Sequence, residues 1–263
     1  MNFIPKKSLG QNFLTDKNTI NIIVETAAIK NYDSVIEVGP GKGSLTQRIL
    51  EKKPDNLTVI EKDERLVSYL HEKFGDKIKI INEDMTKVFY EKLLKENLII
   101  FGNLPYNIST QVLANWIKIN NLNKFCKKLV LMFQKEVADR IIAKSNTKNY
   151  GRLSILSNWR MKVDKIIDIE PGCFNPSPKI KSTLLTFEPL KRYFEINDPK
   201  NLEHVTNTFF SQRRKMIKKP LKILFNNFEE IANELSLDLK LRPQNLDNLT
   251  YYKICKLYEK SIN

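Results

Sequence analysis

Hydrophobic and polar positions follow two different rhythms along this chain. Between about residues 34 and 187, short apolar runs alternate with stretches in which apolar residues recur every three or four positions. The first rhythm is typical of buried strands and the second of helices that pack on a sheet. The predicted strands are 35–38, 57–60, 78–81, 98–101, 129–133, 162–167 and 182–187, and the predicted helices between them are 44–53, 64–74, 110–119 and 135–144.

This alternation predicts an α/β fold in which a mostly parallel sheet is covered by helices on both faces. After Pro189 the strand pattern stops, and the segment 189–199 carries the prolines and charges of a linker. The helices predicted beyond it are 201–210, 213–224, 228–235 and 245–259. We therefore predict two domains, residues 1–190 around the sheet and a smaller, all-helical domain over residues 191–263.

A glycine-rich turn follows the first predicted strand. The sequence VIEVGPGKGS places Gly39, Gly41 and Gly43 between that strand and the next helix. Such a turn lets a ligand approach the backbone, and it serves either the pyrophosphate of a dinucleotide or the methionine part of S-adenosylmethionine. Pro40 removes one backbone donor, which slightly disfavours the pyrophosphate. The turn alone leaves both cofactors open.

Acidic residues follow the next two predicted strands. Glu61 comes roughly 20 residues after Gly39, the usual spacing for a carboxylate that binds ribose hydroxyls. Asp84 follows the third strand and can accept a hydrogen bond from an adenine amino group. Each acid alone is equally well explained as a helix cap or a solvated loop residue. Together with the glycine turn they predict a cofactor that contains adenosine, because open α/β sheets bind ligands at the carboxyl ends of their strands.

The tetrapeptide Asn103-Leu104-Pro105-Tyr106 ends the fourth predicted strand and suits one chemistry. Methylation of an exocyclic base nitrogen needs acceptors for its two N–H bonds and a flat ring on which the base stacks. Asn103 Oδ1 and the Leu104 carbonyl are the candidate acceptors, and Tyr106 is the candidate ring. Pro105 restrains the turn and adds no competing N–H. A plain strand-ending turn would also use Asn and Pro, but a nucleotide-dependent oxidoreductase has no evident use for all four residues.

Charge favours a polyanionic partner. The 263 residues contain 44 Lys and Arg against 30 Asp and Glu, a net charge of +14, and such a surplus is typical of nucleic-acid-binding proteins. A dense basic cluster opens the predicted helical domain. We expect its members to contact RNA phosphates, although a solvated helix face is the alternative. They are Arg213, Arg214, Lys215, Lys218, Lys219 and Lys222.

Other classes of site and setting are disfavoured. The three cysteines and two histidines are scattered without ligand spacing, which predicts neither a disulfide framework nor a metal site. No apolar run approaches the ~20 residues of a membrane span, and the N-terminus lacks the apolar core of a signal peptide. We expect a cytoplasmic protein with no metal and no membrane partner.

Several motifs together closely resemble those of the rRNA adenine N6-dimethyltransferases, and within that family the small-subunit (16S) branch of bacteria. The resemblance covers nearly the whole chain. Besides the glycine turn, its motifs are Leu9 to Leu14 (LGQNFL), Asn103 to Thr110 (NLPYNIST), Gln134 to Val137 (QKEV), Tyr150 to Ser154 (YGRLS), Phe174 to Ile180 (FNPSPKI) and Gln212 to Lys215 (QRRK).

The resemblance implies a Rossmann-like class I S-adenosylmethionine-dependent methyltransferase domain. It implies dimethylation of two adjacent adenosines near the 3′ end of small-subunit rRNA, late in subunit assembly, with S-adenosylhomocysteine as product. The implied partner is that rRNA within a pre-assembled small ribosomal subunit, and we expect a monomer. By motif matching, Asn12 and Leu14 would close over the cofactor. Gly41 would approach its methionine part. The full implied set of cofactor-binding residues is Asn12, Leu14, Gly39, Gly41, Glu61, Asp84 and Asn103.

Two alternatives stay open within this picture. The large-subunit (23S) rRNA dimethyltransferases that confer macrolide resistance share the first motifs, whereas the motifs at Tyr150 to Ser154 and Gln212 to Lys215 look more like the small-subunit branch. The other alternative is an assembly factor that binds immature subunits and whose catalysis is secondary.

Overall fold

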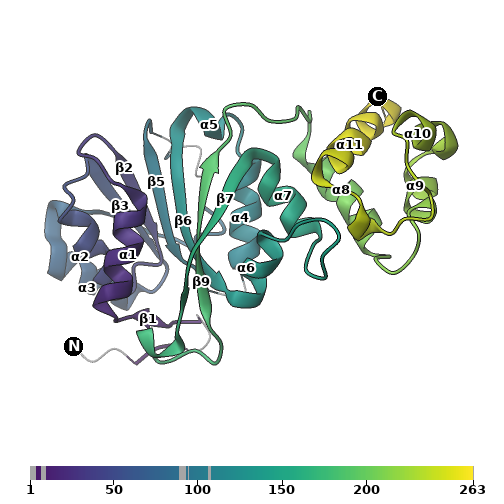
Figure 1. The fold of residues 1–263 in the computed structure, drawn as a ribbon. Coiled ribbons are helices and arrows are strands. Elements are labelled where there is room, and N and C mark those ends of the chain that lie inside the picture. The colour runs from purple at the N-terminus through teal and green to yellow at the C-terminus, as the bar shows by residue number, and fades with distance from the viewer. Residues whose placement is uncertain (1–3, 7–9, 89–92, 94, 106–107, 263) are drawn as a thin grey trace. The chain divides into compact units, whose positions relative to one another are not determined.

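The protein is described by a computed structural model that covers residues 4–6, 10–88, 93, 95–105 and 108–262. By its internal contacts the chain divides into two units (Figure 1). Unit 1 comprises Met1–Ala138 and Lys162–Pro189, and unit 2 comprises Asp139–Met161 and Leu190–Asn263. The domain boundary predicted after residue 190 stays a prediction; the contacts differ from it in grouping 139–161 with the C-terminal helices.

A seven-stranded sheet forms the centre of unit 1, in the order β4-β3-β2-β5-β6-β9-β7. Strands β4, β3, β2, β5 and β6 pair in parallel, and β9 pairs antiparallel with β6. The strands are β2 (Ser34–Val38), β3 (Asn56–Glu61), β4 (Lys79–Asn82), β5 (Leu98–Asn103), β6 (Cys126–Gln134), β7 (Met161–Ile169) and β9 (Ser182–Pro189). This mostly parallel sheet confirms the predicted fold class, and each predicted strand is present.

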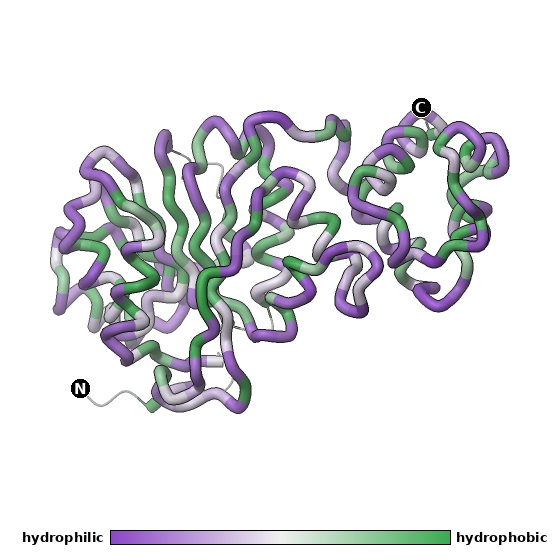
Figure 2. The backbone as a smooth tube through the Cα atoms, in the orientation of Figure 1, coloured by the Kyte–Doolittle hydropathy of each residue, from purple (hydrophilic) through white to green (hydrophobic). Residues whose placement is uncertain are grey.

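The apolar strands pack against helices whose apolar residues recur with helical spacing. These include α1 (Lys17–Ala27), α2 (Ser44–Leu50), α3 (Glu64–Phe74), α4 (Ser109–Lys118) and α5 (Leu122–Phe125), and α6 (Lys135–Ile141) contains the division between units 1 and 2. Val35 and Ile99 share one core with Ile23 of α1 and Ile49 of α2. The alternating residue Ile100 is also fully buried, so the central strands are covered on both faces and read as continuous apolar runs. Figure 2 shows these runs against the hydrophilic loops.

A short second sheet joins the beginning of the chain to a distant segment. Strand β1 (Phe13–Leu14) pairs antiparallel with β8 (Phe174–Asn175), with Phe13 opposite Asn175. The backbone N–H groups of Thr15 and Asp16 extend this contact by donating to the Cys173 carbonyl, at 2.9 and 3.3 Å. A 3-10 turn (Pro171–Cys173) precedes β8. Sequence reasoning missed this sheet.

Unit 2 is built around helices α8 (Pro199–Phe210) and α11 (Asn248–Ile262), with α7 (Arg152–Arg160), α9 (Lys218–Leu224) and α10 (Phe228–Glu234) around them. The Phe209 and Tyr251 rings meet edge to face at 5.3 Å. The buried Tyr150 donates through its hydroxyl to Asn248 at 2.8 Å, and Tyr252 donates to the Ile155 carbonyl at 3.0 Å. The two hydrogen bonds join the segment 139–161 to α11 and help to explain why this segment groups with the C-terminal helices.

One helix of this region begins later than the sequence predicted. The helix predicted over 213–224 begins only at Lys218, because α8 ends at Phe210 and the residues between form turns, such as the one closed by Lys215 N–H and the Gln212 carbonyl. Sequence reasoning did not identify α1, α5 or α7. Within the described part of the chain, no helix is long and apolar enough to cross a membrane.

The three cysteines have different surroundings. Cys126 in β6 and Cys255 in α11 are buried, and burial raises the pKa of each thiol to about 12. Cys173 is half-buried beside β8.

Candidate active site

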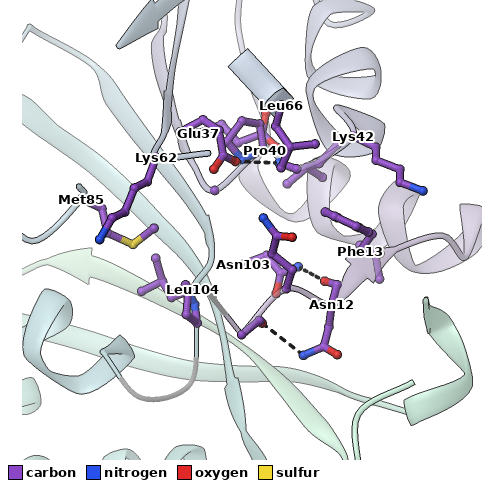
Figure 3. Close-up of a pocket in the computed structure, with 18 of the residues that line it drawn as sticks. Asn12, Phe13, Glu37, Pro40, Lys42, Lys62, Leu66, Met85, Asn103 and Leu104 are labelled. Carbon is purple, nitrogen blue, oxygen red and sulfur yellow. Dashed lines mark hydrogen bonds between the residues drawn. The ribbon is translucent and has the colours of Figure 1, made fainter. Parts of the chain in front are cut away.

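A cavity of about 190 Å³ opens at the carboxyl ends of the central parallel strands of unit 1 (Figure 3). Its walls come from the segments that follow β2, β3, β4 and β5, and from residues 10–14, which we call the N-terminal strap. The predicted site residues that line it are Asn12, Leu14, Gly39, Gly41, Glu61, Asp84, Asn103, Leu104 and Pro105. The structure therefore brings together residues that are up to 93 positions apart, as expected for an open α/β sheet.

The glycine turn has its shape because of the neighbours it touches. Gly41 has a φ of +56°, and a Cβ there would lie 2.7 Å from Cδ1 of Phe13 in the strap. At Gly43, with a φ of +71°, a Cβ would lie 2.5 Å from Cε2 of Phe74. A side chain at either position would be strained and would clash. The absence of side chains thus lets the strap and α3 close on the turn.

Glu61 ends β3 with its carboxylate at the cavity. It is 8% exposed, and it accepts hydrogen bonds from the backbone N–H of Asp63 at 2.9 Å and of Gly41 at 3.4 Å. Burial raises the pKa of Glu61, while these backbone donors act in the opposite direction. The carboxylate is therefore held between the β3 end and the glycine turn, where it can accept further hydrogen bonds from a diol.

Glu37, in the middle of β2, is a site residue that sequence reasoning missed. Its carboxyl group is buried, lines the cavity and accepts a 2.6 Å hydrogen bond from Thr46 Oγ1 of α2. Burial raises the pKa of Glu37 to about 7. The available signal was an acid between Ile36 and Val38 in an otherwise apolar strand, because a buried carboxylate needs a specific partner.

Asp84 lies in the loop after β4, and its carboxylate accepts hydrogen bonds from other side chains of the protein, which the sequence did not predict. Its Oδ2 accepts from Lys62 Nζ at 2.8 Å, and its Oδ1 accepts from Thr86 Oγ1 at 2.7 Å. The hydrogen bond from Lys62 lowers the pKa of Asp84 to about 2. The group is thus an anionic acceptor at the cavity wall whose oxygens already carry partners.

Asn103 ends β5, and its carboxamide is oriented by the N-terminal strap. Nδ2 donates to the backbone carbonyl of Asn12 at 3.2 Å, which Figure 3 shows as a dashed line between the two residues. The amide oxygen is therefore the end of Asn103 that can accept from a ligand amino group. Leu104 and Pro105 also line the cavity. Tyr106 lies outside the described residues, so its predicted stacking role stays a prediction.

The predicted RNA-binding residues lie in unit 2, where most of them surround a hollow of about 560 Å³. We call this the basic hollow, lined by Arg214, Lys215, Met216, Lys218, Lys219, Lys222, Lys240 and Arg242. Lys240 and Arg242 were missed because they are far from the cluster in sequence. Arg213 instead donates to the Lys148 carbonyl.

The basic hollow carries concentrated positive charge. Among the described residues, none of its lysine and arginine side chains forms an ion pair with an acid. Lys218 and Lys222 lie over the Phe228 ring at 5.7 and 4.9 Å from its centre. Uncompensated charge of this kind attracts an anion such as a phosphate. Within the described part of the chain, no cluster of His, Cys, Asp and Glu residues could hold a metal ion.

Sequence comparisons relate the chain to proteins that act on ribosomal RNA. Residues 2–260 match the sequence model of a family described as ribosomal RNA adenine dimethylase. A relative from Pelagibacter ubique (strain HTCC1062), named ribosomal RNA small subunit methyltransferase A, is 54% identical over 97% of both chains. A protein of the same name from Wolbachia sp. subsp. Drosophila simulans (strain wRi) is 44% identical over 96% of this chain and 92% of its own.

Two solved structures share the fold. A dimethyladenosine transferase from Plasmodium falciparum matches with a TM-score of 0.79 and 24% identity, over 94% of this chain and 98% of its own. The 23S rRNA methyltransferase ErmE matches with a TM-score of 0.69 and 21% identity, over 94% of this chain and 100% of its own.

Proposed function

The chain belongs to the ribosomal RNA adenine dimethylase family, and on that premise we propose that it dimethylates N6 of two adjacent adenosines near the 3′ end of small-subunit rRNA. The observation that carries the proposal is the near-full-length similarity to proteins named small subunit methyltransferase A, at 54% identity in one case. The solved 23S enzyme shares only 21% identity, so it supports the fold and does not favour a large-subunit substrate.

We propose S-adenosylmethionine as the methyl donor, bound in the cavity of unit 1. The residues that line the cavity suit this cofactor: a glycine turn with left-handed backbone, the buried Glu61 carboxylate at the end of β3, and Asp84 after β4. Glu61 would accept from the ribose hydroxyls, and Asp84 from the adenine amino group. Asn12 and Leu14, in the strap, would cover the ligand. When bound, S-adenosylmethionine supplies an activated methyl group and leaves as S-adenosylhomocysteine.

The target adenine would be held by the end of β5. Asn103 Oδ1 and the Leu104 carbonyl would accept the two N–H bonds of N6, which directs the nitrogen lone pair toward the methyl group. The methylated nitrogen then loses its proton to water, so no strong base is needed at N6. From the sequence motif we further propose that Tyr106 stacks on the base and offsets ~1–3 kcal/mol of the cost of extruding it.

The basic hollow would bind rRNA phosphates beyond the reacting nucleotide. Its uncompensated charge supports this proposal, because phosphate contacts position a nucleic acid without reading its sequence. From the family resemblance we also propose that the substrate is a pre-assembled small subunit and that the protein acts late in subunit biogenesis. A monomeric state is our expectation.

One experiment tests the substrate directly. The protein is incubated with labelled S-adenosylmethionine and with unmethylated small or large ribosomal subunits, and dimethyladenosine is mapped in each rRNA. We expect two adjacent dimethyladenosines near the 3′ end of the small-subunit rRNA. Labelling confined to the large-subunit rRNA would instead support the alternative substrate, and no labelling of either would refute the proposal.

A further inference from the structure

Asp63, in the turn between β3 and α3, is a charged residue that the proposed reaction does not use. Its side chain is only 1% exposed. The Arg65 guanidinium donates to both carboxylate oxygens, at 3.0 and 2.7 Å, and this interaction holds the pKa of Asp63 well below its usual range. A buried anion of this kind is costly unless it is well paired. Asp63 is also the N-cap of α3, and capping needs only one of its two carboxylate oxygens.

The same carboxylate reaches the N-terminal strap. Gln11 Nε2 donates to Asp63 Oδ2 at 3.0 Å, and Lys6 Nζ lies 3.4 Å from Oδ1. The Lys6 side chain is 46% exposed, so solvent screens its contribution. The Gln11 hydrogen bond is therefore the principal link between Asp63 and the strap.

The backbone N–H of Asp63 contacts a residue of the cavity wall. Its N–H donates to Glu61 Oε1 at 2.9 Å, and Glu61 is the carboxylate proposed to bind the ribose. Asp63 thus contacts both the strap and the ribose-binding carboxylate, although it does not itself line the cavity.

Backbone hydrogen bonds attach the strap to other parts of unit 1 as well. Its Asn12 carbonyl accepts from Asn103, and Phe13 and Leu14 pair with β8. Figure 3 shows Asn12 and Phe13 beside Asn103. Gln11 comes before these attachments in the chain, so its hydrogen bond holds the start of the strap.

We propose that Asp63 is a positioning residue for the cofactor, which keeps the N-terminal strap closed through Gln11 while it orients Glu61 through its own N–H. The proposal rests on the proposed function, because it takes the ligand of this cavity to be S-adenosylmethionine. The strap must open for exchange, so the Gln11–Asp63 hydrogen bond should slow the release of cofactor and product.

The test uses the full chain and the variant Gln11→Ala, since Asp63→Ala would also remove the cap of α3 and destabilise the fold. The matched control is Arg65→Ala, which removes hydrogen bonds to the same carboxylate without touching the strap. The dissociation constant of S-adenosylhomocysteine is measured by calorimetry, together with KM for S-adenosylmethionine and kcat on unmethylated small subunits.

We expect Gln11→Ala to raise the dissociation constant and KM about tenfold, as for the loss of a hydrogen bond to a charged group, with kcat within about twofold. Arg65→Ala should raise them less than about threefold. Gln11→Lys, which keeps a donor for Asp63, should recover most of the affinity. Equal affinity of Gln11→Ala and the unchanged protein, or an equal loss in Arg65→Ala, would overturn the proposal. If the unchanged protein binds no S-adenosylhomocysteine, the proposed function itself fails.

Discussion

At the scale of single residues, Asn103 combines two tasks in one carboxamide. Its Nδ2 is occupied by the Asn12 carbonyl, which leaves the oxygen for the substrate amino group. We expect Asn103→Ala to lower the rate of methyl transfer on the order of 100-fold, because the attacking nitrogen is no longer aligned. S-adenosylhomocysteine binding should weaken only modestly. Single-turnover rates and calorimetry measure the two effects separately.

The control for Asn103 is Asn12→Ala, which keeps the backbone carbonyl that orients the Asn103 amide. It removes a side-chain hydrogen bond to the Gly10 carbonyl and the side chain proposed to cover the cofactor. Its transfer rate, measured with saturating cofactor, should stay close to that of the unchanged protein. Normal turnover by Asn103→Ala would exclude an essential role for its oxygen.

Glu37 makes stability depend on pH. Burial raises its pKa from 4.5 to about 7, repulsion from Glu61 adds to this, and Thr46 and Lys73 oppose it. The folded chain therefore binds this proton more tightly than the unfolded chain does. Its contribution to stability is complete below about pH 4.5 and is lost as the pH rises through about 7.

We expect Glu37→Gln, which keeps an acceptor for Thr46, to remove this dependence. Relative to the unchanged protein it should gain up to roughly 3 kcal/mol of unfolding free energy between pH 4.5 and pH 8. Urea unfolding of both proteins across that range is the measurement. A stability difference that stays constant with pH would contradict the assignment of the raised pKa to Glu37.

The residues found from sequence share one property. Glu61, Asp84 and Asn103 each end or follow a strand, so the general rule for open α/β sheets predicts that they meet. Asp63 also follows a strand, β3, but its partner Gln11 does not, so the rule does not predict that these two residues meet. Their contact joins the chain across more than 50 positions through a single hydrogen bond, and neither residue type announces it locally. Glu37 stands out in the sequence as an acid within an apolar strand, whereas nothing in the sequence marks its hydrogen-bond partner Thr46.

At the scale of elements, the strap and the glycine turn form one contact. Gly41→Ala would bring a Cβ within 2.7 Å of Phe13 Cδ1 at a φ of +56°. We expect both a loss of unfolding free energy of about 1–3 kcal/mol and weaker S-adenosylhomocysteine binding, because Phe13 must move and the strap with it. Urea unfolding and calorimetry report the two quantities.

Gly75→Ala is the matched control, since Gly75 has a φ of +53° and a Cβ there would meet nothing within 4 Å. Gly75→Ala therefore introduces backbone strain without a steric clash. Its unfolding free energy should fall by about 1–3 kcal/mol, with cofactor affinity retained. If both variants bind S-adenosylhomocysteine equally well, the steric link between Gly41 and the strap is irrelevant to binding.

Element prediction was clearest for the buried central strands, and it failed for helix α7 and for the two shortest strands. Strands β2 and β5 are buried on both faces, and both gave apolar runs, which Glu37 interrupts in β2. Helix α7 buries Ser154, Ser157 and Arg160 together with its apolar residues, so its sequence shows no apolar stripe. Strands β1 and β8 have two residues each, too few for any periodicity, and their pairing depends on a contact between distant segments.

At the scale of the whole molecule, the basic hollow should govern the salt dependence of RNA binding. Reversing Lys218, Lys219 and Lys222 to Glu removes three positive charges that have no acidic partner among the described residues. We expect the slope of log affinity against log salt concentration to fall by about three. Filter binding of small-subunit rRNA at several salt concentrations measures this slope.

The matched control reverses Lys162, Lys165 and Lys181, which already pair with Asp164, Asp168 and Glu170 at 2.8, 2.9 and 2.6 Å. The net charge changes equally, so a smaller change in slope would assign the effect to the hollow. Equal slopes in the two variants would mean that only total charge matters.

At this scale the sequence marks one position clearly, because the strand pattern stops at Pro189. Unit 1 also ends at Pro189, and the domain boundary predicted there stays a prediction. The grouping of 139–161 with the C-terminal helices was not accessible, because it depends on hydrogen bonds such as that from Tyr150 to Asn248.

The half-buried Cys173 gives the protein a built-in attachment point for a fluorescent dye. Burial raises the pKa of the thiols of Cys126 and Cys255 to about 12, and such thiols react slowly with maleimides at neutral pH. Labelling should therefore occur at Cys173, whose carbonyl holds the backbone just beyond Leu14. Emission from that position would report whether the N-terminal strap, which pairs with β8 beside Cys173, changes its surroundings when a ligand binds, without any engineered cysteine.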